Sequence, residues 1–166
     1  MHDESIDVGD RVAGCLVLLY GQQLSRIVAL TRGQVSADGN GAHLHLGATE
    51  IQVPEPLGGL LTRLCCCGRL YRGVGSPADT TWVFTGLHPG RPLSASHLGA
   101  RLRRLGIGTI KGRRGAMMHL AGQLPAAVLA DLLNLPNTAC RWVDLAGRDW
   151  THYATEIARR GADREL

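Results

Sequence analysis

Residues 11–30 read RVAGCLVLLYGQQLSRIVAL, and this stretch decides the fold class. It is dense in apolar residues, as expected of segments that pack into a core. Gly21 interrupts the run, and an isolated glycine in a helical pattern favours a bend or a helix end. We therefore predict two helical pieces that meet near Gly21 and contribute side chains to the core.

The pattern changes over residues 34–53, which read QVSADGNGAHLHLGATEIQV. Leu44 and Leu46 alternate with His43 and His45, which is the two-residue period of a strand with one buried face. The DGNG and GATE segments supply turn residues. We therefore expect a small antiparallel sheet, with the two histidines on its solvated face rather than in a metal site.

The remaining chain favours helices, apart from a brief extended run at residues 82–84. Capping and breaking residues predict helices at 57–68, from Ser94 or Ser96 to Gly106, from Pro125 to Leu133, from Asn137 to Gly147 and from Asp149 toward Arg160. The expected fold class is mainly α with a small antiparallel β-sheet (α+β).

Length and composition indicate one domain, because 166 residues with 45% hydrophobic content are enough to close a single core. Residues 1–10 are acidic and polar, and we predict a flexible N-terminus there, followed by one domain over 11–166. The N-terminus does not resemble a secretory signal, and no apolar stretch reaches membrane-spanning length. A cytoplasmic protein with no membrane partner is therefore expected.

The five cysteines do not form a metal-binding pattern. Three of them, at 65–67, are consecutive and lack the two-residue spacer with which two thiolates grip one zinc ion. Cys15 and Cys140 lie far away in sequence. We therefore expect reduced, partly buried thiols and no metal site.

The positive charge is concentrated in one part of the chain. The formal net charge is +4 and the pI is near 9.0, which permits a polyanionic partner without requiring one. Residues 112–120 read GRRGAMMHL, and their arginine pair is predicted to open a helix. Guanidinium forks are suited to gripping a phosphodiester. Double-stranded DNA is the expected partner, contacted by Arg101, Arg103, Arg104, Lys111, Arg113 and Arg114.

Several local strings resemble the C-terminal catalytic domain of tyrosine recombinases, the phage-integrase family, over about residues 11–144. LLYGQQLSRIVAL at 18–30 is similar to the family's LLY followed by G-L-R-x-S-E-L. VFTGLHPGRPLSASHLGARLRRLGI at 83–107 is similar to the link from the sheet into the following helix. The resemblance places Gln23 at the first catalytic arginine and Arg26 at the family's glutamate, where its charge can reach DNA from another angle.

The family's second box, H-x-L-R-H-T-F-A-T-H-L, resembles RRGAMMHL at 113–120. This likeness implies that Arg113 is the second catalytic arginine and that His119 is the later catalytic histidine. Ile110 stands at the box's first histidine, with Lys111 one residue away, and Arg114 replaces the histidine after the arginine. From the apolar neighbours of His119, a hydrogen-bonded core histidine is the competing expectation.

The family's tyrosine nucleophile has no direct counterpart. LLNL at 132–135 resembles the family's L-L-G-H, and counting onward from it reaches Trp142 or Asp144. Neither side chain can attack phosphorus as a phenolate. Tyr153 is the one candidate for a displaced nucleophile, and GATEIQV at 47–53 lacks the family's hairpin lysine.

The resemblance implies a recombinase-like catalytic fold, a link to DNA integration and recombination, and no cofactor. The tyrosine, the arginines and the proton-transfer groups act as a unit in such chemistry. Their incomplete set predicts a DNA-binding domain with an impaired active site. Nothing before Arg11 is long enough to be the family's separate N-terminal helical domain.

Two alternatives stay open. Residues 125–147 also fit a helix-turn-helix that places Asn137, Thr138 and Arg141 in a major groove. In the other alternative, the terminal segment WTHYATEIARR at 150–160 docks as an amphipathic helix on a second copy of the chain or on an intact recombinase, and the chain binds no DNA.

Overall fold

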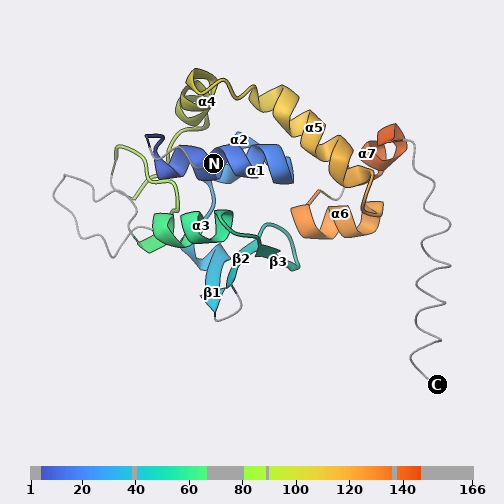
Figure 1. Cartoon of the computed structure of the whole chain (residues 1–166), viewed down its shortest axis with the longest axis horizontal. Helices are drawn as coiled ribbons and strands as arrows, with labels where there is room; N and C mark the ends of the chain where they lie inside the picture. Colours follow the sequence, from blue (N-terminus) through green and yellow to red (C-terminus); the bar gives the residue numbers. More distant parts are fainter. Residues whose placement is uncertain (1–4, 39–40, 67–80, 89, 136–137, 147–166) are drawn as a thin grey trace.

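The computed structural model describes residues 5–38, 41–66, 81–88, 90–135 and 138–146. These residues form α-helices and one small antiparallel sheet, which confirms the expected α+β class. The helices are α1 (Val8–Tyr20), α2 (Leu24–Val28), α3 (Leu57–Cys66), α4 (Ala95–Arg104), α5 (Thr109–Ala121), α6 (Ala126–Leu133) and α7 (Ala139–Ala146). Figure 1 shows α1 between two groups, with α3 and the sheet on one side and α4 and α5 on the other.

The predicted break at Gly21 is confirmed. Gly21 caps the C-terminus of α1 in the left-handed conformation, with φ of 59°, and its N–H donates to the carbonyl of Leu16. A Cβ at this position would lie 2.6 Å from Sδ of Met117 on α5. Both the backbone angle and the close approach of α5 therefore require glycine here.

The expected boundary at residue 10 is wrong, because α1 begins at Val8. The carboxylate of Asp7 accepts a hydrogen bond from the N–H of Gly9 at 2.9 Å and caps the helix. Asp10 lies in the first turn and is only 8% exposed. The acidic residues at 7 and 10 thus start the first helix rather than belonging to a flexible N-terminus.

The sheet forms where the two-residue period predicts it. Strands β1 (Val35–Asp38), β2 (Gly41–His45) and β3 (Glu50–Val53) pair in the order β1-β2-β3, and both pairings are antiparallel. On β2, Ala42 and Leu44 are buried while His43 and His45 are half-buried on the other face. The buried face packs on α3, which gives the strand its one-sided pattern.

The apolar side chains gather in two clusters. The first combines α1, α2, the sheet, α3 and α4, and the second combines α5, α6 and α7. Tyr20 at the end of α1 and Leu46 after β2 pack against both. The junction between the clusters therefore lies at the end of α1, beside Gly21.

Most helix boundaries agree with the capping signals. Ser94 caps α4, with its hydroxyl accepting from the N–H of His97 at 3.2 Å. Gly106 follows the end of α4 with φ of 78°. Val83 and Phe84 are buried, and the N–H of Val83 donates to the carbonyl of Leu30 at 2.9 Å. They lie in a bend between isolated bridges at Trp82 and Thr85, so the α4 cap is confirmed and the extended run is limited to these bridges.

The start of α5 differs from the expectation that the arginine pair opens the helix. The helix begins at Thr109, so Arg113 and Arg114 lie in its second turn. Gly112 lies within the helix and against α1, where a Cβ would be 2.7 Å from Cδ2 of Leu18. The glycine marks a close helix contact rather than a helix start.

Other expectations fall on residues outside the described ranges. These are the cap at Asn137, the cap at Asp149, the terminal helix and the candidate nucleophile Tyr153. Among the helices of the described ranges, none has the length and apolar character needed to cross a lipid bilayer.

Candidate nucleic-acid interface

A cavity of about 450 Å³ lies where the α1–α2 junction, the start of α5 and α7 meet. Side chains that are distant in sequence line it together. They are Gln22, Gln23, Leu24, Ser25, Thr109, Ile110, Arg113, Arg114 and Trp142. Four of these, Gln23, Ile110, Arg113 and Trp142, occupy positions that the recombinase resemblance assigns to catalytic groups.

Arg113 is the half-buried cation of this cavity. Its Nε donates to the carbonyl oxygen of Gly21 at 2.8 Å, which ties α5 to the end of α1. Burial lowers the pKa of Arg113 below its ordinary value, and the neighbouring charge of Arg26 lowers it further. The side chain nevertheless stays charged, because an arginine pKa lies far above neutral pH.

Arg26 is the second cation at this junction. Its Nη1 donates to the carbonyl oxygen of Leu133 at 2.7 Å, at the C-terminal end of α6, where a cation is favoured. Within the described ranges neither Arg26 nor Arg113 forms an ion pair with a carboxylate. Two guanidinium groups held on carbonyl oxygens without an anion are a favourable setting for a phosphate.

Both arginines of the pair line one cavity, although they differ in exposure on α5. Arg113 lies on the half-buried side of the helix, and Arg114 is exposed, yet both line the cavity. Lys111 is exposed and lies three residues before Arg114, which places both on neighbouring positions of the outer face. Arg113 and Arg114 therefore line the same cavity, and neither forms an ion pair with a carboxylate in the described part of the chain.

The N-terminus of α5 adds positive potential at the same place. Thr109 and Ile110 are the first two residues of the helix, and both line the cavity. Gly108 in the N-cap position provides no side chain to cap the first turn. The first-turn N–H groups of a helix attract anions, and this end of α5 supports the arginines.

The surrounding sequence contains no acidic residue to neutralise these cations. Residues 80–130 include no Asp or Glu at all. The same segment carries Arg91, Arg101, Arg103, Arg104, Lys111, Arg113 and Arg114. A modest net charge over the whole chain therefore conceals a strongly basic middle segment.

Arg101, a predicted DNA contact, is paired with two acidic residues in the structure. Its Nε donates to Oδ2 of Asp10 at 3.0 Å and lies 2.8 Å from Oδ1, while its Nη2 lies 2.9 Å from Asp7. The side chains of Arg101 and Asp10 are 19% and 11% exposed. Arg101 thus joins α4 to the start of α1, where both acidic residues satisfy it.

The neighbouring arginines of α4 remain on the surface. Arg103 and Arg104 are both exposed. Nε of Arg103 donates to the carbonyl of Gly99 within the same helix at 3.3 Å. Neither residue forms an ion pair with any described carboxylate, so both stay available to a polyanion.

His119 is exposed on α5, which contradicts the expectation of a hydrogen-bonded core histidine. Its neighbour Met117 turns into the second cluster with no exposed area, while Met118 is 36% exposed. The position of His119 on the outer face of the helix explains the difference. His119 does not line the cavity, so nothing here brings it to Arg113.

The β2–β3 turn is fixed to α6 rather than to the cavity. The N–H of Ala48 donates to the carbonyl of Asp131 at 3.1 Å, and the hydroxyl of Thr49 donates to the carboxylate of Asp131. Glu50 accepts from the hydroxyl of Ser36 at 2.9 Å. The two polar residues at the place of the family's hairpin lysine are therefore both bound elsewhere.

The expected nucleophile position is occupied by an indole. Trp142 on α7 lines the cavity and also packs against the second cluster. Asp144 is exposed on the same helix and does not line the cavity. Tyr20 is half-buried between the clusters, and burial raises its pKa, which disfavours the phenolate.

Gln22 and Trp142 line the cavity but were not among the sequence-predicted contacts. Gln22 is 4% exposed, and its side chain makes no hydrogen bond with any described residue. Its position directly after the helix-ending Gly21 is the only sequence signal that could have indicated it. Trp142 cannot act as a nucleophile, but its aromatic side chain lines the cavity and can bind a ligand without reacting.

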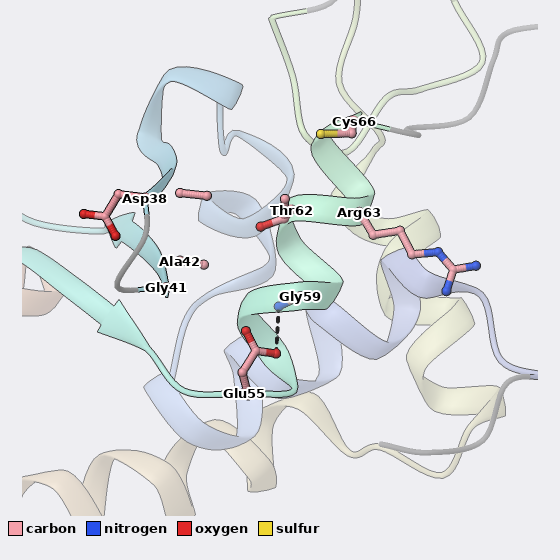
Figure 2. Close-up of a pocket in the computed structure, with 9 residues that line it drawn as sticks. Asp38, Gly41, Ala42, Glu55, Gly59, Thr62, Arg63 and Cys66 are labelled. Carbon is pink, nitrogen blue, oxygen red and sulfur yellow. Dashed lines mark hydrogen bonds between the residues drawn. The ribbon is translucent and has the colours of Figure 1, made fainter.

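A second cavity, of about 410 Å³, lies between the sheet and α3. In Figure 2 Arg63 extends away from the other labelled side chains, and Glu55 accepts a hydrogen bond from the N–H of Gly59 at 3.1 Å. The hydroxyl of Thr62 donates to the carbonyl of Gly58 within α3. These polar groups serve the helix itself, so this cavity lacks the convergent cations of the first.

Possible metal ligands do not converge within the described ranges, where no group of three His, Cys, Asp or Glu residues could hold an ion. His43 lies 3.4 Å from Asp38, and His45 lies 3.3 Å from Glu50. The four described cysteines are free thiols, namely Cys15, Cys65, Cys66 and Cys140.

Comparison with known proteins found no matching protein family, no matching characterised protein and no matching solved structure.

Proposed function

We propose that this chain is a DNA-binding domain related to the catalytic domain of tyrosine recombinases, and that it holds a phosphodiester at Arg113 without cutting it. One observation carries the proposal. The side chains at four positions that the resemblance assigns to catalytic groups line a single cavity, together with a second arginine and the N-terminus of α5.

The electrostatics of the cavity support an anionic ligand. Arg113 and Arg26 are anchored on carbonyl oxygens, and each retains guanidinium N–H groups that make no bond to a described residue. Arginine forks match the geometry of phosphate oxygens. The exposed Lys111 and Arg114 extend the positive surface along α5 for neighbouring phosphates of a strand.

The αL residue after α6 is a further supporting detail. Asn134 has φ of 52° and stands where the family has glycine in L-L-G-H. Asparagine is the residue that most readily replaces glycine in this conformation. The left-handed end of α6 is thus compatible with the family's pattern.

Strand cleavage is not part of the proposal, because the described residues that line the cavity include no tyrosine and only one of the family's two arginines. A phosphotyrosyl bond requires a phenolate, and the cavity holds an indole instead. Gln23 offers only neutral hydrogen bonds where a cation would stabilise a crowded phosphorane. Losing one such donor alone costs about a hundredfold or more in rate.

The test is a trapping assay with a nicked duplex that retains covalent intermediates. We expect binding of the duplex and no denaturation-resistant protein–DNA adduct. The matched control is Tyr153→Phe in the full chain, which should behave as the unchanged protein. An adduct that forms with the unchanged chain and disappears in Tyr153→Phe would replace this proposal with an active recombinase.

The helix-turn-helix alternative rests on a separate observation. Thr138 and Arg141 are exposed at three-residue spacing around the start of α7, which packs on α6. If α7 reads bases, Arg141→Ala will relax sequence preference while Arg113→Ala weakens all duplexes alike. Equal losses on all sequences for both variants would discard base reading by α7.

A further inference from the structure

The cavity at α5 combines three kinds of side chain that one ligand class uses together. Arg113 and Arg114 provide guanidinium groups, Gln22 and Gln23 provide amides, and Trp142 provides an aromatic ring. Guanidinium groups bind phosphates, amides bind the edges of bases, and aromatic rings stack on base faces. A backbone phosphate alone would use only the first of these.

Trp142 has no role in phosphate chemistry but is well placed for stacking. It is half-buried, packs against the second cluster and lines the cavity. Packing on the protein side restricts the ring, so a ligand that stacks on it loses little further freedom. The indole N–H donates and cannot attack phosphorus.

Gln22 adds a side-chain amide to the wall of the cavity. The residue is 4% exposed, lines the cavity, and its side-chain amide has no hydrogen-bond partner among the described residues. An amide that both donates and accepts is suited to the edge of a base.

The size of the cavity agrees with one nucleotide. Its volume of about 450 Å³ lies within the range of about 300–1000 Å³ that small-molecule sites occupy. A paired base inside a continuous duplex is stacked between its neighbours and cannot enter such a space. Only an unpaired or extruded nucleotide presents both faces and its edge.

We infer that this cavity accepts one unpaired nucleotide of a DNA strand, with its base on Trp142 and its phosphate on Arg113. The inference rests on the proposed DNA-binding function. A nucleotide within a strand is favoured over a free mononucleotide, because the exposed Arg114 at the cavity and Lys111 three residues before it on α5 can bind the flanking phosphates.

The experiment compares the binding of three labelled probes by fluorescence anisotropy at low salt. They are a blunt duplex, the same duplex with a single-stranded overhang, and the overhang oligonucleotide alone. We expect the overhang duplex to bind about tenfold more tightly than the blunt duplex, a typical effect of stacking one base. Unlabelled dAMP at the concentration of the oligonucleotide should not compete.

Two variants connect the preference to the cavity. Trp142→Phe should keep the preference for the overhang and Trp142→Leu should remove it. Trp142 also packs in the second cluster, so Gln22→Met provides a second variant that conserves volume and removes only the amide. We expect Gln22→Met to fold and to reduce the preference several-fold.

The outcomes separate this inference from the proposed function. If the blunt duplex binds in an Arg113-dependent manner and the overhang adds nothing, the nucleotide site is refuted while DNA binding stands. A preference that both Trp142→Leu and Gln22→Met leave unchanged also refutes it. If dAMP competes as well as the oligonucleotide, the strand requirement is wrong. Absence of binding by every probe at low salt overturns both proposals.

Discussion

Nε of Arg113 donates to the carbonyl oxygen of Gly21 at 2.8 Å, although 92 positions of sequence separate the two residues. This bond occupies one donor of the guanidinium, and its two Nη groups make no hydrogen bond or ion pair with another described residue. The fold therefore positions the cation and leaves a bidentate fork for an anion.

Gly21 is the residue on which this arrangement depends, and Gly21→Ala tests it. The substitution forces alanine into a backbone with φ of 59° and places Cβ 2.6 Å from Sδ of Met117. We expect a loss of about 2–4 kcal/mol in the free energy of unfolding, measured by urea denaturation. Gly33→Ala is the matched control, because no atom lies near its Cβ. Equal stability of the two variants would contradict the close packing at Gly21.

Anions should stabilise the protein through Arg113. Arg26 and Arg113 repel one another without a carboxylate partner in the described part of the chain, so a bound phosphate group relieves an unfavourable charge. We expect inorganic phosphate to raise the Tm of the unchanged chain more than that of Arg113→Gln. Arg63→Gln, on the distant helix α3, removes the same charge and should respond like the unchanged chain (Figure 1). A uniform response of all three would show only a general salt effect.

Arg101 and Arg104 lie on the same helix and should separate stability from binding. Arg101 joins Asp7 and Asp10 in a largely buried ion pair, so Arg101→Met should cost about 2 kcal/mol of unfolding free energy and leave DNA affinity nearly unchanged. Arg104 is exposed, and Arg104→Met should leave stability unchanged and lower the affinity. Thermal denaturation and DNA titration of both variants test this, and a reversed pattern would refute the assignment.

The stability of the protein should fall at alkaline pH. Burial raises the pKa of Cys15, Cys65 and Tyr20 above their ordinary values. The folded state holds these protons more tightly than the unfolded state, so their stabilising effect is complete below the ordinary thiol pKa of about 9 and is lost as the pH rises through the folded values. The urea concentration at the unfolding midpoint should fall as the pH is raised above about 9. Cys15→Ala should make this fall smaller.

Thiol reactivity gives a second readout of the same burial. Cys66 and Cys140 are exposed, while Cys15 and Cys65 are half-buried with raised pKa values. Alkylation by iodoacetamide near pH 8, mapped by mass spectrometry, should modify the exposed pair first because the thiolate is the reactive form. Faster modification of Cys15 than of Cys140 would contradict the packing around α1.

Local patterns allowed much of the fold to be predicted. The two-residue period around Leu44 and the cap at Ser94 depend on neighbouring residues, so they can be identified without tertiary information. The start of α5 could not be located in this way, because Gly112 lies inside the helix, where a Cβ would meet Leu18 on α1. A glycine that ends a helix cannot be distinguished in sequence from a glycine inside a helix that allows a second helix to pack closely.

The same limit applies to the site. Composition and spacing identified Arg113 and Arg114, but Arg101 looked equivalent until Asp7 and Asp10 were found beside it. Acidic residues that are distant in sequence determine whether an arginine is held in an ion pair or is available to a ligand. Gln22 became a site residue only when its burial next to the cavity was known.

The most direct test of DNA backbone binding is the salt dependence of duplex affinity for the unchanged chain, Arg113→Gln and Arg63→Gln. We expect measurable binding at low salt, a steep linear fall of log K with log salt, and a slope that decreases by about one for Arg113→Gln. Arg63→Gln should retain the original slope and affinity. No binding at low salt, or identical curves for the two variants, would contradict the claim that the cavity at Arg113 holds a DNA strand.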